Sequence, residues 1–212
     1  MVKVNNNAYH APAEKKRIFF NVQDSRFISS LYPVRCEKEK RNALAAVTGE
    51  YRDATHNTYA YRIGCGSSLI ERAFDDREPA GTAGAPMLQL LQGKDISDIL
   101  IVGTRYFGGT KLGIGGLTRA YRDCARLVLD ETKLILKEPQ KSYKLEMAYS
   151  DLGAVSRVAE SLGAAIEKVD YSDRVKIYLT IPARKAQNLL KGFDSATRGE
   201  GSVVDIASRK QI

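Results

Sequence analysis

The stretch ILIVGTRYFGGTKLGIGGLTRAYRDCAR, residues 99–126, decides how this chain folds. Its first four residues, Ile99 to Val102, are all apolar and predict a buried strand. A glycine-rich loop follows, and a helix is expected to begin near Leu117. A strand, a glycine-rich loop and a helix in this order can direct free backbone N–H groups towards an anion. The glycines of the predicted loop are Gly108, Gly109, Gly113, Gly115 and Gly116.

The predicted helix has a basic face and an apolar face. Arg119, Arg122 and Arg126 recur at spacings of three and four residues, so they share one side of the helix. Together with Arg105 and Lys111, these arginines are the candidate cations of an anion-binding surface. An arginine stripe is also common on a solvated helix face, and a glycine-rich loop is also common as a tight turn. The opposite face of the helix, predicted to be buried, carries Leu117, Tyr121, Cys124 and Val128.

The loop matches neither of the two common nucleotide-binding motifs. No Gly-Lys-Ser/Thr closes it, and it does not follow the G-x-G-x-x-G pattern. Tyr106 and Phe107 are available to stack on nucleic-acid bases, or to pack in the core at the end of the strand. The loop therefore predicts an anion-binding site without naming the anion.

Composition narrows the class of protein. The 212 residues include 33 Lys and Arg against 25 Asp and Glu, which gives a net charge of +8 and permits a nucleic-acid partner. The sequence contains no pattern specific for DNA binding. No apolar run approaches the roughly 20 residues of a membrane span. The first residues lack the apolar core of a secretory signal, so a cytoplasmic location is expected. Three cysteines without a C-x-x-C pair and two histidines argue against a disulfide scaffold or a zinc site, and no cofactor is expected.

An acidic cluster offers an alternative chemistry. Asp75, Asp76 and Glu78 fall within four positions, and could bind a divalent cation or share a proton. His56, expected close to at least one of them, could act as a general base. Such a set would suit a metal-assisted phosphoryl hydrolase. The same carboxylates could instead pair with arginines, including Arg119, or cap the helix that follows, so catalysis stays an open question and a non-enzymatic role is favoured.

The pattern changes near Glu138-Pro139, which predicts two domains, residues 1–135 and 140–212. Residues 1–24 are expected to be partly ordered at most. In the first domain we expect strands at 26–34, 55–64 with one buried face, and 69–74, and helices at 37–47, where Gly49 ends the helix, and from about 83 or 85 to 92. In the second domain the order is β-α-β-β-α-β, the ferredoxin-like arrangement, with Ser150 or Asp151 capping its first helix. The predicted class is α+β.

Four segments carry a family resemblance. They are SRFIS (25–29), ATHNTYAYRIG (54–64), DDREPAGTAGAP (75–86) and TRYFGGTKLGIGGLTRAY (104–121). In order and spacing they resemble the signature blocks of the IMPACT/YigZ family, once catalogued as an uncharacterised protein family. The resemblance is to the bacterial two-domain type.

The resemblance implies a fold and a role. The first domain would be similar to domain IV of elongation factor G, a two-layer α/β domain like those of ribosomal proteins, and the second to the factor's ferredoxin-like domain V. Both relatives contact ribosomal RNA, so RNA, the ribosome or translation factors are the implied partners. Eukaryotic IMPACT proteins regulate translation initiation under stress by competing for an activator of an initiation-factor kinase. They do so through an additional N-terminal domain that has no counterpart in these residues, so the resemblance does not imply that partner here. The implied function is a non-enzymatic regulatory protein that binds RNA or the translation machinery. The two alternatives are a metal-assisted phosphoryl hydrolase and a protein-interaction scaffold without RNA contact.

One position departs from the family pattern. The acidic block normally reads Asp-Asp-Gly-Glu-Pro, and Arg77 takes the place of the glycine here. If the glycine provides a positive φ angle, Arg77 is strained. If the glycine admits a ligand, Arg77 narrows the approach.

Overall fold

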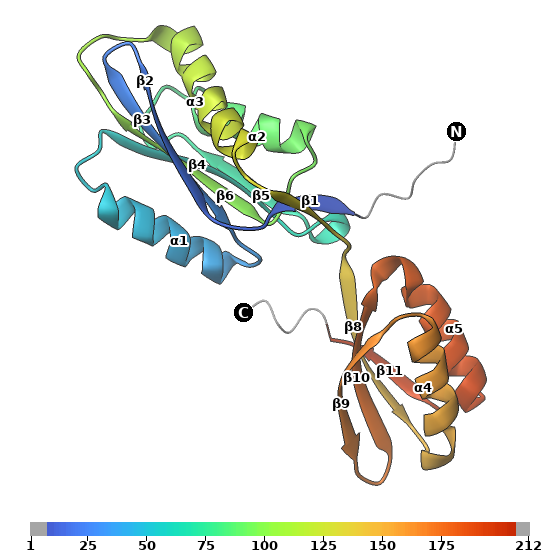
Figure 1. Ribbon diagram of the computed structural model, residues 1–212. Coiled ribbons are helices and arrows are strands. Elements are labelled where there is room, and N and C mark those ends of the chain that lie inside the picture. Colours follow the sequence, from blue (N-terminus) through green and yellow to red (C-terminus); the bar gives the residue numbers. More distant parts are fainter. Residues whose placement is uncertain (1–7, 207–212) are drawn as a thin grey trace, which may run out of the picture. The chain divides into compact units, whose positions relative to one another are not determined.

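The computed structural model describes residues 8–206 and divides them into two compact units, residues 8–137 and 138–206 (Figure 1). Each unit combines helices with antiparallel strands, so the predicted α+β class is confirmed. Within residues 8–206, no helix is both long and apolar enough to cross a membrane.

The N-terminal unit is built on an antiparallel five-stranded sheet with the order β2-β3-β6-β4-β5. The central strand is β6, and its residues Ile99 to Val102 are fully buried, as predicted. A strand covered on both faces needs apolar side chains at successive positions, which explains the continuous run. The strands are β2 (Lys16–Val22), β3 (Ser25–Pro33), β4 (His56–Ile63), β5 (Ile70–Phe74) and β6 (Ile99–Tyr106).

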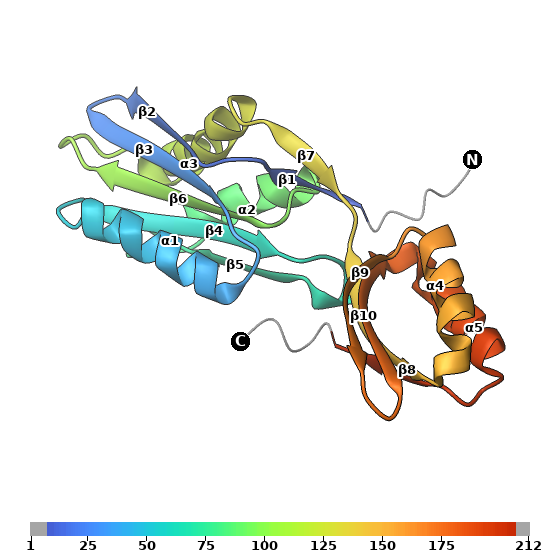
Figure 2. The same cartoon turned by 60° about the horizontal axis from the view of Figure 1, so that its bottom comes forward.

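Helices cover both faces of this sheet (Figures 1 and 2). Helices α2 (Gly84–Gly93) and α3 (Gly113–Asp130) pack on the face that carries Ile99 and Ile101. Helix α1 (Glu37–Glu50) packs on the face that carries Leu100 and Val102. The unit therefore has three layers, where the resemblance implied two.

The second covered face also corrects the prediction for β4. Its alternation suggested one buried face, formed by Tyr59, Tyr61 and Ile63. Those residues do pack under α1, but Ala60 on the other face is equally buried against the α2 and α3 side. Small or polar side chains at alternate positions of a strand can face either a covering helix or solvent, so the alternation alone does not show that one face is exposed.

The start of the described chain is more regular than predicted. Strand β1 (Tyr9–Pro12) pairs antiparallel with β7 (Leu134–Lys137), and β2 joins the main sheet. The expectation of partial order for residues 1–24 is therefore wrong for these strands, and residues 1–7 lie outside the described residues. The order of β1 comes from pairing with residues more than 100 positions away, which a local reading of the sequence does not reveal, whereas β2 forms a hairpin with the adjacent β3.

Both long helices of this unit pass through glycines that were expected to bound them. Helix α1 continues to Glu50, past Gly49, and α3 begins at Gly113, four residues before Leu117. Glycine lowers helix stability by roughly 1 kcal/mol per residue, but packing of the apolar face outweighs that cost. The buried and exposed faces of α3 are as predicted.

The C-terminal unit has the predicted β-α-β-β-α-β order, and its antiparallel sheet is ordered β11-β8-β10-β9. Its core joins alternate residues of β8 and β10 to the two helices. The first helix follows a single 3-10 turn, and neither Ser150 nor Asp151 caps it with a side-chain hydrogen bond, contrary to prediction. The elements are β8 (Gln140–Met147), α4 (Leu152–Ser161), β9 (Ala165–Tyr171), β10 (Val175–Pro182), α5 (Ala186–Thr197) and β11 (Ser202–Asp205).

Candidate functional site

The glycines of the predicted loop have different structural roles. A Cβ atom on Gly108 would lie 1.8 Å from the carbonyl oxygen of Asp24, so this glycine lets the loop pack against the β2–β3 turn. Gly109 has a φ of 101°, in the left-handed region that favours glycine. Gly115 and Gly116 lie in the first turn of α3. The glycine-rich segment is thus a short loop followed directly by a helix N-terminus.

This helix N-terminus is suited to an anion. Leu112 occupies the N-cap position and has no side-chain acceptor, and within residues 8–206 no hydrogen bond from the first N–H groups of α3 to another side chain is present. The first turn also contains no acidic residue. An 18-residue helix carries the equivalent of about half a positive charge at such an end.

The candidate cations fall into three groups. Lys111, Arg119 and Arg122 are exposed, and none of them forms an ion pair with any residue in the range 8–206. Arg126 is also exposed, but it pairs with Asp123 at 3.0 Å and Asp130 at 3.4 Å on its own helix. The fifth, Arg105, is buried.

Arg105 belongs to a buried polar network instead of the exposed surface where it was predicted. Its Nη1 atom donates to Glu78 Oε1 at 2.9 Å, and the Tyr121 hydroxyl donates to the same oxygen at 2.8 Å. Nη2 of Arg105 donates to Ser25 Oγ at 3.1 Å. Arg105 is 5% exposed and Glu78 is 7% exposed. Burial and the neighbouring Glu78 carboxylate raise the pKa of Tyr121, which keeps its hydroxyl protonated as a donor.

His56 lies beside this network. Its Nε2 atom is 3.7 Å from Glu78 Oε1, which confirms the expected closeness to a carboxylate. Its Nδ1 atom is 2.7 Å from the carbonyl oxygen of Asp76. Because only an N–H can hydrogen-bond to a carbonyl, this contact requires an N–H at Nδ1. Both ring nitrogens therefore face structural partners.

Asp75 acts as the cap of α2, one of the structural alternatives left open by the sequence. Its Oδ1 atom accepts the N–H groups of Ala83 at 3.1 Å and Gly84 at 2.8 Å. Its Oδ2 atom accepts the N–H of Gly81 at 2.8 Å. Three hydrogen bonds to one carboxylate hold the loop and the start of the helix together.

Asp76 binds a different partner from Asp75 and Glu78, so the three carboxylates of the acidic cluster do not face a common point. Its Oδ2 atom accepts the N–H of Asn57 at 2.7 Å. Among the described residues, no three His, Cys, Asp or Glu side chains are placed to hold a metal ion. The suggested pairing of Arg119 with Asp75 or Asp76 is wrong, since those carboxylates bind backbone N–H groups and Arg119 points to solvent.

The two aromatic residues before the loop differ in their freedom to stack on a base. The Arg26 guanidinium lies 4.3 Å from the centre of the Tyr106 ring, and the Tyr106 hydroxyl donates to Asp53 at 2.7 Å. Phe107 is 43% exposed, and the Arg105 guanidinium lies 5.4 Å from the centre of its ring. Phe107 is thus the better placed of the two to meet a ligand.

A pocket of about 310 Å³ opens beside the start of α3. Its walls are apolar, and Glu78 and Arg105 of the buried network also line it. Lys111 contributes to the lining as well, and Ile114 is 70% exposed. The apolar walls are formed by Pro79, Phe107, Leu112, Ile114 and Leu117.

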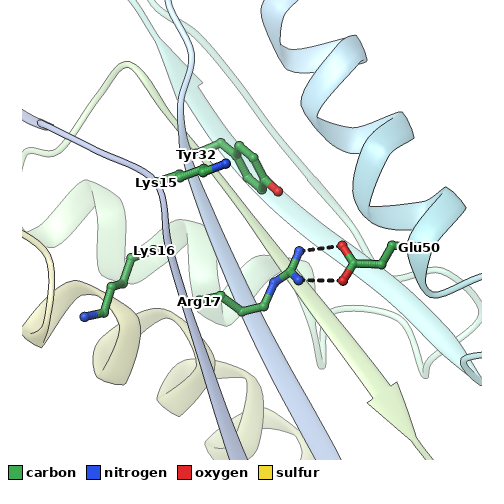
Figure 3. A pocket seen from close by; sticks show the side chains of 5 residues that line it. All are labelled: Lys15, Lys16, Arg17, Tyr32 and Glu50. Carbon is green, nitrogen blue, oxygen red and sulfur yellow. Dashed lines mark hydrogen bonds and ion pairs between the residues drawn. The ribbon is translucent and has the colours of Figure 1, made fainter.

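A second hollow, of about 350 Å³, is lined by Lys15, Lys16, Arg17, Tyr32 and Glu50 (Figure 3). Figure 3 shows the guanidinium of Arg17 facing the Glu50 carboxylate, which it meets with two hydrogen bonds of 2.7 and 2.8 Å. Lys16 pairs with Glu131 at 3.0 Å. Most of the positive charge here is already neutralised, so the α3 end is the stronger candidate for an anion.

Arg77 has the backbone conformation that the family glycine suggested. Its φ is 68°, and that of Asp76 is 40°. A left-handed conformation costs a residue with a Cβ about 1–2 kcal/mol, partly offset by the greater chain entropy that glycine loses on folding. Arg77→Gly is therefore expected to raise the free energy of unfolding by about 0.5–1 kcal/mol, measured by urea denaturation. Arg77→Ala keeps the Cβ and is the control; an equal gain from alanine would show that the backbone angle is not the cause.

Sequence reasoning missed two members of the buried network, Tyr121 and Ser25. The helical pattern places Tyr121 correctly on the buried face of α3, where a hydroxyl needs a hydrogen-bond partner. That requirement was the available signal for a buried acceptor, and the acceptor is Glu78. Ser25 carries no comparable signal.

The fold agrees with comparisons to known proteins. The sequence profile described as "Impact N-terminal domain" matches residues 23–129, and "Domain of unknown function (DUF1949)" matches residues 145–200. A solved structure described as "Crystal structure of an hypothetical protein" has a TM-score of 0.68 and 29% identity, and covers 95% of this chain and 98% of that chain. The two profiles together cover most of both units.

Similar sequences carry one family name. IMPACT family member YvyE of Bacillus subtilis is 31% identical over 86% of this chain and 83% of its own length. IMPACT family member YigZ of Escherichia coli is 31% identical over 89% of this chain and 93% of its own length. Protein IMPACT of Homo sapiens is 33% identical over 57% of this chain and 38% of its own length. The chain belongs to the IMPACT family, as the signature blocks indicated.

Proposed function

We propose that this chain is a non-enzymatic binding protein linked to translation, and that it contacts RNA through the N-terminal end of α3 and the loop before it. The observation that carries the proposal is the group of exposed cations Lys111, Arg119 and Arg122, which form no ion pair within residues 8–206 and lie on the loop and on the exposed face of the helix that follows it. Backbone N–H groups and unpaired cations on one surface match the oxygens of phosphate groups.

The link to translation rests on the family. The relatives include eukaryotic Protein IMPACT, and the resemblance implies regulation of translation and domains similar to those of elongation factor G. RNA of the translation machinery, in the cytoplasm, is the partner that joins this implication to a phosphate-binding surface. The hydrolase alternative finds less support, because Asp75, Asp76 and Glu78 each face a different structural partner.

The proposal predicts how binding of single-stranded RNA depends on salt. Removal of one cation that binds a phosphate should reduce the slope of log affinity against log salt by about 0.7. Lys111→Ala and Arg119→Ala are each expected to weaken binding across unrelated sequences and to lower the slope by this amount. Neither residue packs in the core, so melting temperatures should stay within about 3 °C of the parent protein. Fluorescence anisotropy over a salt titration measures the slope.

Arg126→Ala is the matched control on the same helix. Because Arg126 is already paired with Asp123 and Asp130, its removal should change the slope less than the removal of Arg119. Unchanged RNA affinity in both Lys111→Ala and Arg119→Ala over the whole titration would contradict the proposal. An interaction scaffold without RNA contact would then be the better account.

A further inference from the structure

The pocket beside α3 contains an unusual carboxylate. The side chain of Glu78 is 3% exposed, and its two donors, Arg105 and Tyr121, approach the same oxygen as His56, Oε1. The other oxygen, Oε2, accepts no hydrogen bond from any side chain or backbone group within residues 8–206. It is nevertheless not sealed from solvent, and Glu78 lines the pocket. Glu78 thus brings an acceptor with no donor among the described residues to the lining of a hollow whose walls are mainly apolar.

The charges around the pocket define the group that this acceptor can take. Arg105 neutralises Glu78 from one side, and Lys111 adds a further positive charge to the lining. A cationic ligand would meet two positive groups, so a neutral donor of hydrogen bonds is favoured. An anionic group attached to that donor would be stabilised by Lys111 and by the end of α3.

An apolar side chain of a protein partner fits the charges less well. It would cover Glu78 Oε2 without offering it a donor, and leaving a buried acceptor unpaired is costly. A nucleobase is flat and largely apolar, offers N–H donors at its edge, and is attached to a phosphate. A pocket of about 310 Å³ is at the lower end of the roughly 300–1,000 Å³ usual for small-molecule sites, which favours a small occupant.

We propose that this pocket holds one unstacked RNA base that carries an exocyclic amino group, with that amino group donating to Glu78 Oε2. The inference rests on the RNA-binding function proposed above and adds base selectivity to it. Bases taken out of a stack are recognised in this way, by contact with aromatic side chains and by hydrogen bonds to their edges. Phe107 supplies the aromatic contact, and a carboxylate that accepts from the amino group of cytosine is a known pairing.

Cytosine and uracil make the sharpest comparison. Both are pyrimidines of the same size, but cytosine has an amino donor where uracil has a carbonyl acceptor. The uracil oxygen would face the Glu78 carboxylate, acceptor against acceptor. Oligocytidylate is therefore expected to bind at least roughly tenfold more tightly than oligouridylate of equal length. Both oligomers should show the same salt slope, because their phosphates are the same.

The experiment measures the Kd of the full chain for fluorescein-labelled oligo(C) and oligo(U) at one fixed salt concentration. A third oligomer with N4,N4-dimethylcytidine tests the donor with the unaltered protein, since it lacks both N–H groups and should bind no better than oligo(U). Glu78→Gln replaces Oε2 with a donor if its remaining oxygen stays with Arg105 and Tyr121. That variant should lose or reverse the preference for cytosine.

Glu71→Gln is the matched control, because Glu71 also pairs with a buried arginine, Arg62, at 2.9 Å, but does not line the pocket. It should keep the full preference. Equal binding of oligo(C) and oligo(U), with a normal salt slope, would overturn the pocket assignment and leave the RNA-binding function standing. Binding of neither oligomer would overturn both, and an apolar side chain of a protein partner would replace the base as the expected occupant. If Glu78→Gln does not fold, tight binding of the dimethylated oligomer would still contradict the proposal.

Discussion

Replacing Arg105 with alanine is expected to lower the free energy of unfolding of the N-terminal unit by about 3–5 kcal/mol. The side chain of Arg105 is 6% exposed, and the side chain of its partner Glu78 is 3% exposed. Alanine would remove the charge that faces Glu78 and leave the carboxylate buried with only the Tyr121 hydroxyl as a hydrogen-bond donor. An uncompensated buried charge is far more costly than the loss of an exposed ion pair.

A double variant separates the charge from the packing. Arg105→Met combined with Glu78→Gln removes both charges and keeps similar volumes, so much of the lost stability should return. Urea denaturation followed by far-ultraviolet circular dichroism is the suitable measurement, since the sequence contains no tryptophan. A loss below about 1 kcal/mol for Arg105→Ala would show that water entering from the pocket solvates the Glu78 charge about as well as Arg105 does.

Gly84→Ala is expected to cost about 2–3 kcal/mol of stability. A Cβ atom at this position would lie 2.5 Å from the backbone nitrogen of Phe74 and 3.0 Å from the carbonyl oxygen of Tyr59. Both neighbours are backbone atoms of paired strands, which cannot rotate away as a side chain can. The start of α2 would have to move off the sheet, and its hydrogen bond to Asp75 would be strained.

Gly93→Ala is the control at the other end of the same helix. No atom lies within 4 Å of the Cβ that it would add, and its backbone does not require glycine. Alanine is the better helix former, so this change should be neutral or stabilising by up to about 1 kcal/mol. Equal losses at the two positions in thermal or urea denaturation would argue against close packing as the cause.

The sequence predicted the parts of this fold that have a clear period. The strand at Ile99, the two faces of α3 and the β-α-β-β-α-β order all follow from apolar residues that recur at regular spacings. The three-layer arrangement was missed, because the alternation in β4 suggested one buried face; the continuous apolar run from Ile99 to Val102 is the signal that both faces of the sheet are covered. Pairing of β1 with β7 depends on residues far apart in the chain, so local patterns carry no trace of it.

The candidate site shows the same division. Helical periodicity predicts that Arg119 and Arg122 share an exposed face, and the structure exposes both. Arg105 was predicted on an exposed cationic surface, and it is buried. The apolar run that indicates the strand ends at Val102, so no pattern in the sequence indicated that the strand continues through Arg105. In the longer β6, a period of two puts Arg105 on the same face as Ile99 and Ile101, under α2 and α3. The pocket arises from segments that are separated in the chain, and no spacing in the sequence indicates its volume.

The order of the N-terminal sheet has a further consequence at its two edges. Within the described chain, β2 and β5 each pair on one side only, so each leaves backbone N–H and C=O groups that another strand could join. Both edges carry charge, with Lys16 and Arg17 on β2 and Glu71 and Arg72 on β5, and β5 is only five residues long. Short, charged edge strands oppose pairing with a second molecule. The charged residues on the two edge strands thus also disfavour aggregation by strand addition.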